Sequence, residues 1–226
     1  MKKLNVFTLA AAALFLTACG GKSAEETTTT AGEQTVAEKQ GDVFAVNLET
    51  SKVNWKAFHK GGFAPRWGTL MIQSGEVSLA EGQLTAGDFV INMKSLTADP
   101  ASVTEKDKKS TDLDAHLKNA DFFDVEKHPT ADFKITKVAP LETADKDAVA
   151  GANKTISGNL TLKGKALNVT FPAKVTVTEG NATIEAKFTV NRADWDIKFG
   201  TSEADPAEWM ISKDIEIGID VKAAKK

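Results

Sequence analysis

The chain has a single cysteine, Cys19, no tyrosine and only three histidines among its 226 residues. One cysteine excludes an intrachain disulfide and any metal site built from several thiolates. Basic stretches interleaved with aromatic residues are also missing, which excludes the usual pattern of nucleic-acid binding. Acidic residues outnumber basic ones by 31 to 28, giving a net charge of −3. A domain built from this sequence must therefore be held together by its apolar core.

The first nineteen residues have the layout of an export signal. Lys2 and Lys3 precede a short apolar run that begins at Val6 and ends in the tetrapeptide Leu16-Thr17-Ala18-Cys19. The run is too short to span a bilayer, which takes roughly 20 apolar residues. Small residues directly before a cysteine are typical of a bacterial lipoprotein, so we expect residues 1–18 to be a signal peptide and Cys19 to carry palmitate and other acyl chains. The alternative is an ordinary secretory signal in which the cysteine has no role.

Residues 19–41 are predicted to be the lipidated cysteine followed by a disordered tether. After Cys19 this stretch is mainly Gly, Ser, Thr, Glu, Ala and Lys, with no aromatic residue. Such a polar composition cannot bury enough apolar surface to fold. Because Gly20 rather than an aspartate follows the cysteine, the expected location is the cell envelope, anchored to the outer membrane and facing the periplasm.

The remainder, residues 42–226, is predicted to form one all-β domain. Apolar and polar residues alternate with a period of two, which is typical of strands with one buried and one wet face; the clearest runs are 53–57, 89–94, 133–136, 184–190 and 215–222. Turn-forming residues separate the runs at Ser74-Gly75, Glu81-Gly82 and Glu179-Gly180-Asn181. About eight strands in one chain favour a closed antiparallel barrel or a sandwich.

One segment departs from the strand pattern and predicts a short helix near one end of the β structure. Between Asp99 and Lys118 the chain is charged, and Leu113, His116, Leu117 and Ala120 follow helical spacing. A capping residue is expected within 110–112. Such a helix would act as a plug or a lid on a barrel.

No catalytic constellation is present in the sequence. The three histidines, His59, His116 and His128, have no spacing that favours a shared metal, and no nucleophile elbow, phosphate-binding loop or dinucleotide fingerprint occurs. The sequence therefore predicts a protein that is not an enzyme and needs no metal or cofactor.

The aromatic residues leave two alternatives open. An eight-stranded barrel has a size at which the interior either fills with side chains or holds one small ligand. Small residues at inward positions would leave room for a ligand; they are Ala57, Gly68, Ala86, Gly158 and Ala186. Pattern alone does not choose between a filled core and a cavity.

Several segments, in order along the domain, resemble the YceI-like family. The most specific is Asp114–Val125 followed by His128–Phe133. The others are Ser51–Lys60 with Gly68–Leu70, Gly82–Phe89 with Asn92–Leu96, Gly158–Gly164, and Val190–Trp195. The resemblance implies an eight-stranded antiparallel, lipocalin-like barrel with a short helical insert near one end. It also implies an exported protein that binds an isoprenoid lipid, polyprenyl or quinone-like, along the barrel.

On this basis we expect a membrane-anchored envelope protein that sequesters or carries such a lipid in its cavity. Strand parity and the helix spacing give the expected lining: Val53, Trp55, Leu70, Phe89, Ile91, Met93, Leu117, Phe122, Phe133, Ile135, Leu160, Phe188, Ile217 and Ile219. Polar candidates for the lipid head group at the mouth, or else for an internal hydrogen bond, are His116, Asn159 and Arg192; for Arg192 the structural alternative is a buried pair with Asp194 or a carbonyl. The competing hypothesis is a filled barrel whose exterior, around Trp67, Trp195 and Trp209, binds another envelope protein. The oligomeric state stays open, with a dimer as one alternative.

Overall fold

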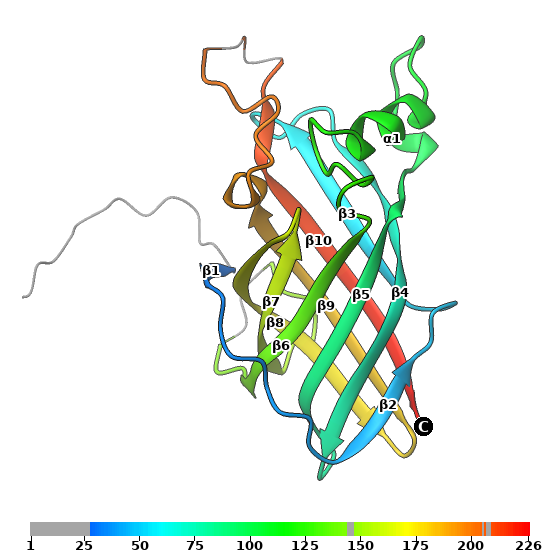
Figure 1. The fold of residues 1–226 in the computed structure, drawn as a ribbon, viewed down its shortest axis with the longest axis vertical. Helices are drawn as coiled ribbons and strands as arrows, with labels where there is room; N and C mark the ends of the chain where they lie inside the picture. Colours follow the sequence, from blue (N-terminus) through cyan, green and yellow to red (C-terminus); the bar gives the residue numbers. More distant parts are fainter. Residues whose placement is uncertain (1–27, 144–146, 205, 207–208) are drawn as a thin grey trace, which may run out of the picture.

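A computed structural model describes residues 28–143, 147–204, 206 and 209–226, so the expected signal peptide and Cys19 lie outside the described residues. Ten strands, one α-helix and two 3-10 helices make up the described part (Figure 1). The strands are β1 (Thr29–Gly32), β2 (Asp42–Val46), β3 (Lys52–His59), β4 (Arg66–Ala80), β5 (Gln83–Ala98), β6 (Thr130–Pro140), β7 (Lys154–Leu162), β8 (Lys165–Thr178), β9 (Asn181–Asn191) and β10 (Ile211–Lys225).

The sheet closes on itself as an antiparallel barrel. Each strand from β4 to β10 pairs with the next along the chain, and β10 pairs on its other side with β3 and β2. Because β2 and β3 both lie between β4 and β10, they occupy one position of the barrel, which therefore has eight positions. The predicted eight-stranded antiparallel barrel is confirmed.

Turn chemistry accounts for the hairpin between β4 and β5. Glu81 and Gly82 both have positive φ, 52° and 73°, as a tight two-residue hairpin turn requires. The expectation of a turn at Ser74-Gly75 is wrong, because both residues lie inside β4, where the register with β5 shifts. A Cβ on Gly75 would meet Val46 and Phe89 at 2.9 and 3.1 Å, so this glycine admits a close neighbour rather than ending a strand.

The helix α1 (Ser110–Lys118) lies at one end of the barrel, as predicted (Figure 1). The backbone N–H of Ala98, at the end of β5, donates to Asp114 Oδ1 at 2.6 Å and ties the helix to the sheet. The expected cap within 110–112 is wrong: the N-cap is Lys109, which makes no side-chain capping bond. The 3-10 helices are η1 (Pro100–Ser102) and η2 (Arg192–Trp195). We call the part of the barrel next to α1 the open half, and the part near the β4–β5 and β8–β9 turns the closed half.

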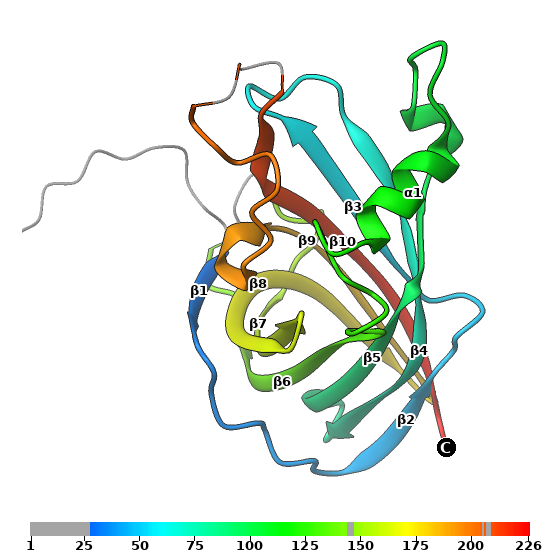
Figure 2. The same cartoon turned by 45° about the horizontal axis from the view of Figure 1, so that its top comes forward.

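Residues 28–41 correct part of the prediction of a disordered tether, whose residues 20–27 lie outside the described residues. Residues 28–41 run along the outside of the barrel from β8 past β6 to β2 (Figure 2), and we call them the strap. Since β9 pairs with β8 only from Ala173 onward, the backbone of Leu167–Thr170 has a free edge, and β1 pairs with that edge. The Ala37 N–H donates to the carbonyl of Ile135 at 2.9 Å, next to a register shift in β6. Composition missed the strap because backbone hydrogen bonds hold it, rather than apolar side chains.

Candidate functional site

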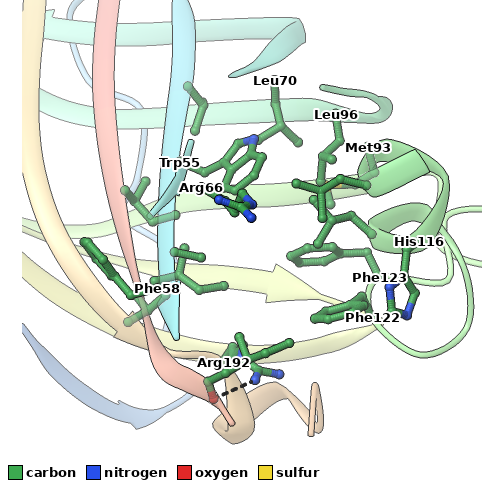
Figure 3. A pocket seen from close by; sticks show the side chains of 18 of the residues that line it. Trp55, Phe58, Arg66, Leu70, Met93, Leu96, His116, Phe122, Phe123 and Arg192 are labelled. Carbon is green, nitrogen blue, oxygen red and sulfur yellow. Dashed lines mark hydrogen bonds between the residues drawn. The ribbon is translucent and has the colours of Figure 1, made fainter. Parts of the chain in front are cut away.

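The open half contains a cavity of about 720 Å³. Seven of the eight barrel positions contribute residues to its wall, and β8 does not. The helix α1 and the segments beside it complete the wall. Figure 3 shows Phe122, Phe123, His116 and Met93 on the side of the space next to the helix, with Trp55 and Phe58 across from them. The volume and the mainly apolar lining fall within the range of small-ligand sites. The open half is thus not filled by its side chains.

A layer of phenylalanine rings forms the floor of the cavity. Phe171 and Phe188 stack with ring centroids 4.0 Å apart and planes 4° apart, and Phe133 lies 5.7 Å from Phe171 and 6.3 Å from Phe89. Below this floor lies a small void of about 50 Å³, lined by residues such as Ile135 and by Phe171 itself. The closed half is therefore packed and the open half is hollow.

The structure brings twelve of the fourteen expected lining residues together in the cavity wall. These are Val53, Trp55, Leu70, Ile91, Met93, Leu117, Phe122, Phe133, Leu160, Phe188, Ile217 and Ile219. Phe89 and Ile135 point inward as expected, but they lie at and below the floor, beside the small void. The alternation along a strand predicts whether a side chain points into the barrel. The position of the phenylalanine floor along the barrel axis depends instead on side-chain packing between strands.

Two of the small inward residues, Gly68 and Gly158, do not leave room for a ligand, because neighbouring groups occupy the space beside them. A Cβ on Gly68 would collide with the carbonyl of Thr97 and approach the indole nitrogen of Trp55. A Cβ on Gly158 would collide with the ring of Phe133. These glycines make room for large neighbouring rings, and the Trp55 indole N–H then donates to the Thr97 carbonyl at 3.2 Å.

His116 lies at the mouth of the cavity, as expected, on the last turn of α1. Its ring contacts the edges of Phe122 and Phe199 at centroid distances of 5.0 and 4.9 Å. Its Nε2 lies 3.1 Å from Asp121 Oδ2. The imidazole is thus held by two aromatic rings and a carboxylate at the edge of the apolar space.

Arg192 also lines the cavity, but its donors are committed to the backbone. Its guanidinium donates to the carbonyls of Ile197 and Phe199, each at 2.8 Å, and to those of Ser212 and Ile211 at 2.9 and 3.3 Å. Among the alternatives, the carbonyl partner is confirmed and the pair with Asp194 is not formed. Burial lowers the pKa of Arg192 to about 10, so the group keeps its charge at neutral pH, with its carbon 5.7 Å from the centre of the Phe122 ring.

Asn159 is not at the mouth. It lies on the outer face of β7 and exchanges two hydrogen bonds with the backbone of Gln34 in the strap, at 3.0 and 2.7 Å. Asn168 Nδ2 donates to the same Oδ1 at 2.9 Å. Its parity along β7, opposite to that of Leu160, already indicated the outer face.

Sequence reasoning missed a second cation at the mouth, Arg66. It begins β4, donates to the carbonyl of Ser102 at 2.8 Å and pairs with Glu105. This joins the β3–β4 turn to the segment before α1. The only sequence signal was a basic residue at the first position of a strand.

The surface proposed for a protein partner is not assembled. Trp195 is fully buried, and its indole N–H donates to the carbonyl of Leu160 at 3.0 Å. Trp209 is 69% exposed, whereas Trp67 is half-buried.

Within the described ranges no group of three or more His, Cys, Asp or Glu side chains is placed to bind a metal. The helix of the described part is not long and apolar enough to cross a membrane.

Comparison with known proteins fits this architecture. A family model described as "YceI-like domain" matches residues 44–223, most of the chain. The chain belongs to the YceI-like family. Among its YceI-like relatives, a UPF0312 protein of Pectobacterium atrosepticum is 32% identical over 151 residues, which cover 62% of this chain and 70% of the relative. Protein YceI of Escherichia coli O6:H1 is 30% identical over 151 residues with the same two shares.

Solved structures share the YceI-like barrel. Burkholderia cenocepacia BcnA is 20% identical with a TM-score of 0.57, and the match covers 79% of this chain and 99% of BcnA. A polyisoprenoid binding domain from Saccharophagus degradans, implicated in plant cell wall breakdown, is 14% identical with a TM-score of 0.52, covering 81% of this chain and 98% of that domain. At these identities the likeness shows the fold.

Proposed function

We propose that this protein binds one apolar chain lipid of the isoprenoid class, a polyprenol or a quinone, in the open half of its barrel. The observation that carries the proposal is the hollow, mainly apolar cavity of about 720 Å³ above a floor of stacked phenylalanines. A structural neighbour described as a polyisoprenoid binding domain supports the choice of ligand class. The proposal involves no catalytic step.

Burial of the ligand supplies the binding energy. Apolar surface removed from water contributes about 25 cal/mol per Å², so about 600 Å² of ligand surface would contribute about 15 kcal/mol. Association costs on the order of 7 kcal/mol would leave about 8 kcal/mol, which corresponds to micromolar affinity. No charged partner for the chain of the ligand is needed.

The head group would lie at the mouth, where the polar side chains are. His116 lies at the edge of the apolar space beside Phe122, and Arg66 closes the other side of the opening next to Trp55 (Figure 3). Arg192 adds a buried positive charge, while its hydrogen bonds go to the backbone. A head group with partly negative oxygen atoms suits this surrounding.

We also propose that Cys19 carries the lipid anchor and that the barrel works in the cell envelope, on the periplasmic side of the outer membrane. The support is the sequence of residues 1–19. Labelled palmitate should appear in the protein in its own host and be absent from a Cys19→Ser variant. Equal labelling of the variant would contradict the anchor.

The test of ligand binding is native mass spectrometry, with organic extraction, of the mature chain without acyl chains, purified from its host without detergent. We expect one species of isoprenoid mass for each barrel. A ligand-free mass that does not change after incubation with polyprenols and quinones would contradict the proposed function.

A further inference from the structure

Exposed aromatic side chains gather at one place on the described surface, the mouth of the cavity. Phe63, Phe199 and Trp209 are 45%, 42% and 69% exposed. Phe63 and Trp209 line the opening, while Phe199 contacts His116 and Phe122. The other large apolar side chains exposed to this degree in the described part are not aromatic and lie apart, on the strap, in a turn and on β4: Val36, Leu48 and Met71.

These aromatic residues belong to segments that extend beyond the end of the barrel. We call residues 59–66, 103–109, 198–204 and 209–211 the mouth rim; its segments form the end of the molecule next to α1 (Figure 1). Backbone hydrogen bonds hold three of the segments together, from Lys60 N–H to the Met210 carbonyl at 2.8 Å and from Ile211 N–H to the Gly200 carbonyl at 2.8 Å. The His59 N–H donates to the carbonyl of Phe63 at 3.0 Å, which closes the turn that presents Phe63.

The charges in this part of the chain nearly balance. Within the sequence of 59–66, 103–109 and 198–211 there are six basic and five acidic residues: Lys60, Arg66, Lys106, Lys108, Lys109 and Lys198 against Glu105, Asp107, Glu203, Asp205 and Glu208. Strong electrostatic attraction to an anionic surface is therefore not expected. Aromatic side chains with an apolar body favour the interface between lipid headgroups and acyl chains, whatever the headgroup charge.

The strap shortens the link to a membrane anchor. Nine residues separate Cys19 from Thr29, and Thr29 is paired with Thr170 on β8. Fully extended, this link reaches at most about 35 Å. Thr170 lies five residues from the mouth-side end of β8 and eight from its other end. The barrel is thus held near the bilayer, with its mouth within reach of it.

We propose that the mouth rim docks on the lipid bilayer, with Phe63, Phe199 and Trp209 in the headgroup region. The cavity then opens directly onto the membrane, so an apolar lipid passes into it without crossing water. This inference rests on the proposed function for its purpose, although the docking itself is measured separately. The partner is a bilayer surface, and the driving force is burial of aromatic surface rather than charge.

The test uses the mature chain, residues 19–226 without acyl chains, and vesicles of neutral phosphatidylcholine. We expect co-sedimentation with the vesicles, and quenching of tryptophan emission by brominated acyl chains. Trp209→Ser and Phe63→Ser should each lower the vesicle-bound fraction by about fivefold or more. Met71→Ser is the matched control, because Met71 is 59% exposed on the outer face of β4 and should leave the bound fraction unchanged.

Three results would overturn the docking: no wild-type binding to vesicles, an equal loss in Met71→Ser, or binding confined to anionic phosphatidylglycerol vesicles and abolished by salt. Titration of the wild type with geranylgeraniol in the absence of vesicles separates the two proposals. Geranylgeraniol binding without vesicle binding contradicts the docking alone. Vesicle binding without geranylgeraniol binding contradicts the proposed function alone.

Discussion

The open and closed halves of the barrel are built from the same strands with the same alternation, yet one is hollow and the other is packed. Strand β10 shows the difference along a single chain segment. Ile215, Ile217 and Ile219 are half-buried and face the open half, whereas Val221 and Ala223 are buried in the closed half. All five point inward. Alternation therefore tells which side chains face the interior but not whether the interior is full.

The packing of large rings creates the difference. In the middle of the barrel the stacked pair of Phe171 and Phe188 fills the cross-section, and Gly158 admits Phe133 beside them. Above this level the barrel contains the cavity of about 720 Å³. The floor made of the rings of Phe89, Phe133, Phe171 and Phe188 thus sets the depth of the cavity.

The largest expected contrast comes from the same substitution in the two halves. Ile135→Ala removes a fully buried side chain below the floor and should lower the free energy of unfolding by about 3–4 kcal/mol, since a cavity remains in a packed region. Ile217→Ala removes a half-buried side chain from a wall that already faces a cavity, and should cost about 1–2 kcal/mol. Urea unfolding of both variants measures the difference. Equal losses would mean that the open half is packed like the closed half.

Arg192 stabilises the open half by donating hydrogen bonds to four backbone carbonyls. Arg192→Met should lower the free energy of unfolding by about 2–4 kcal/mol, because the carbonyls of Ile197, Phe199, Ser212 and Ile211 lose a shared donor. Unfolding by urea, with hydrogen exchange of residues 197–212, measures the effect. An unchanged stability would show that these carbonyls find other donors.

Adding one methyl group at Gly158 should shift the phenylalanine floor toward the cavity and make the cavity shallower. In Gly158→Ala the new Cβ would displace the Phe133 ring toward the cavity, at a cost of about 1–3 kcal/mol and with weaker binding of geranylgeraniol. Gly32→Ala is the matched control, because a Cβ there meets no atom within 4 Å. Calorimetric titration of both variants gives the binding change. Unchanged affinity in Gly158→Ala would place the ligand elsewhere.

The smallest expected effect concerns the strap at the closed end. Hydrogen bonds from Lys226 and then Lys39 hold the pKa of Glu76 down to about 2, from an ordinary value of 4.5. Because the pKa is lower in the folded chain, these ion pairs stabilise it above about pH 4.5, and the contribution is lost as the pH falls toward 2. The pairs are partly exposed, so less than about 1 kcal/mol is expected. Protection of the strap from hydrogen exchange, measured relative to the intrinsic rate at each pH, should fall at pH 3 in the wild type and change less in Glu76→Gln. An identical change in both would exclude these ion pairs.

The barrel, its helix and most of the cavity wall follow from the sequence, for reasons that can be named. A period of two places Val53, Trp55, Ile217 and Ile219 inside whatever the details of packing. The depth of Phe89 and Ile135 relative to the floor depends on which rings meet across strands that are far apart in sequence. The residue pattern of a single strand does not predict these ring contacts between strands.

The predicted disorder of the strap and the predicted mouth position of Asn159 were wrong for a different reason, whereas the alternative for Asn159, an internal hydrogen bond, is observed. The strap is polar and was predicted to be disordered, but the unpaired edge of β8 and the side chain of Asn159 supply it with hydrogen bonds. That edge exists only because β9 leaves β8 at Ala173, a property of barrel closure. Parity along β7 placed Asn159 outside, and only its polarity suggested the mouth.

Photolabelling tests the central claim, that the open half is the lipid site, most directly. The mature chain is illuminated with a geranylgeraniol analogue that carries a diazirine, and the labelled residues are identified by mass spectrometry. The account predicts about one label for each barrel, on open-half residues such as Leu160, Phe122 and Ile217. Labels confined to outer-face residues such as Met71 or to the strap, or labelling that does not saturate, would contradict it.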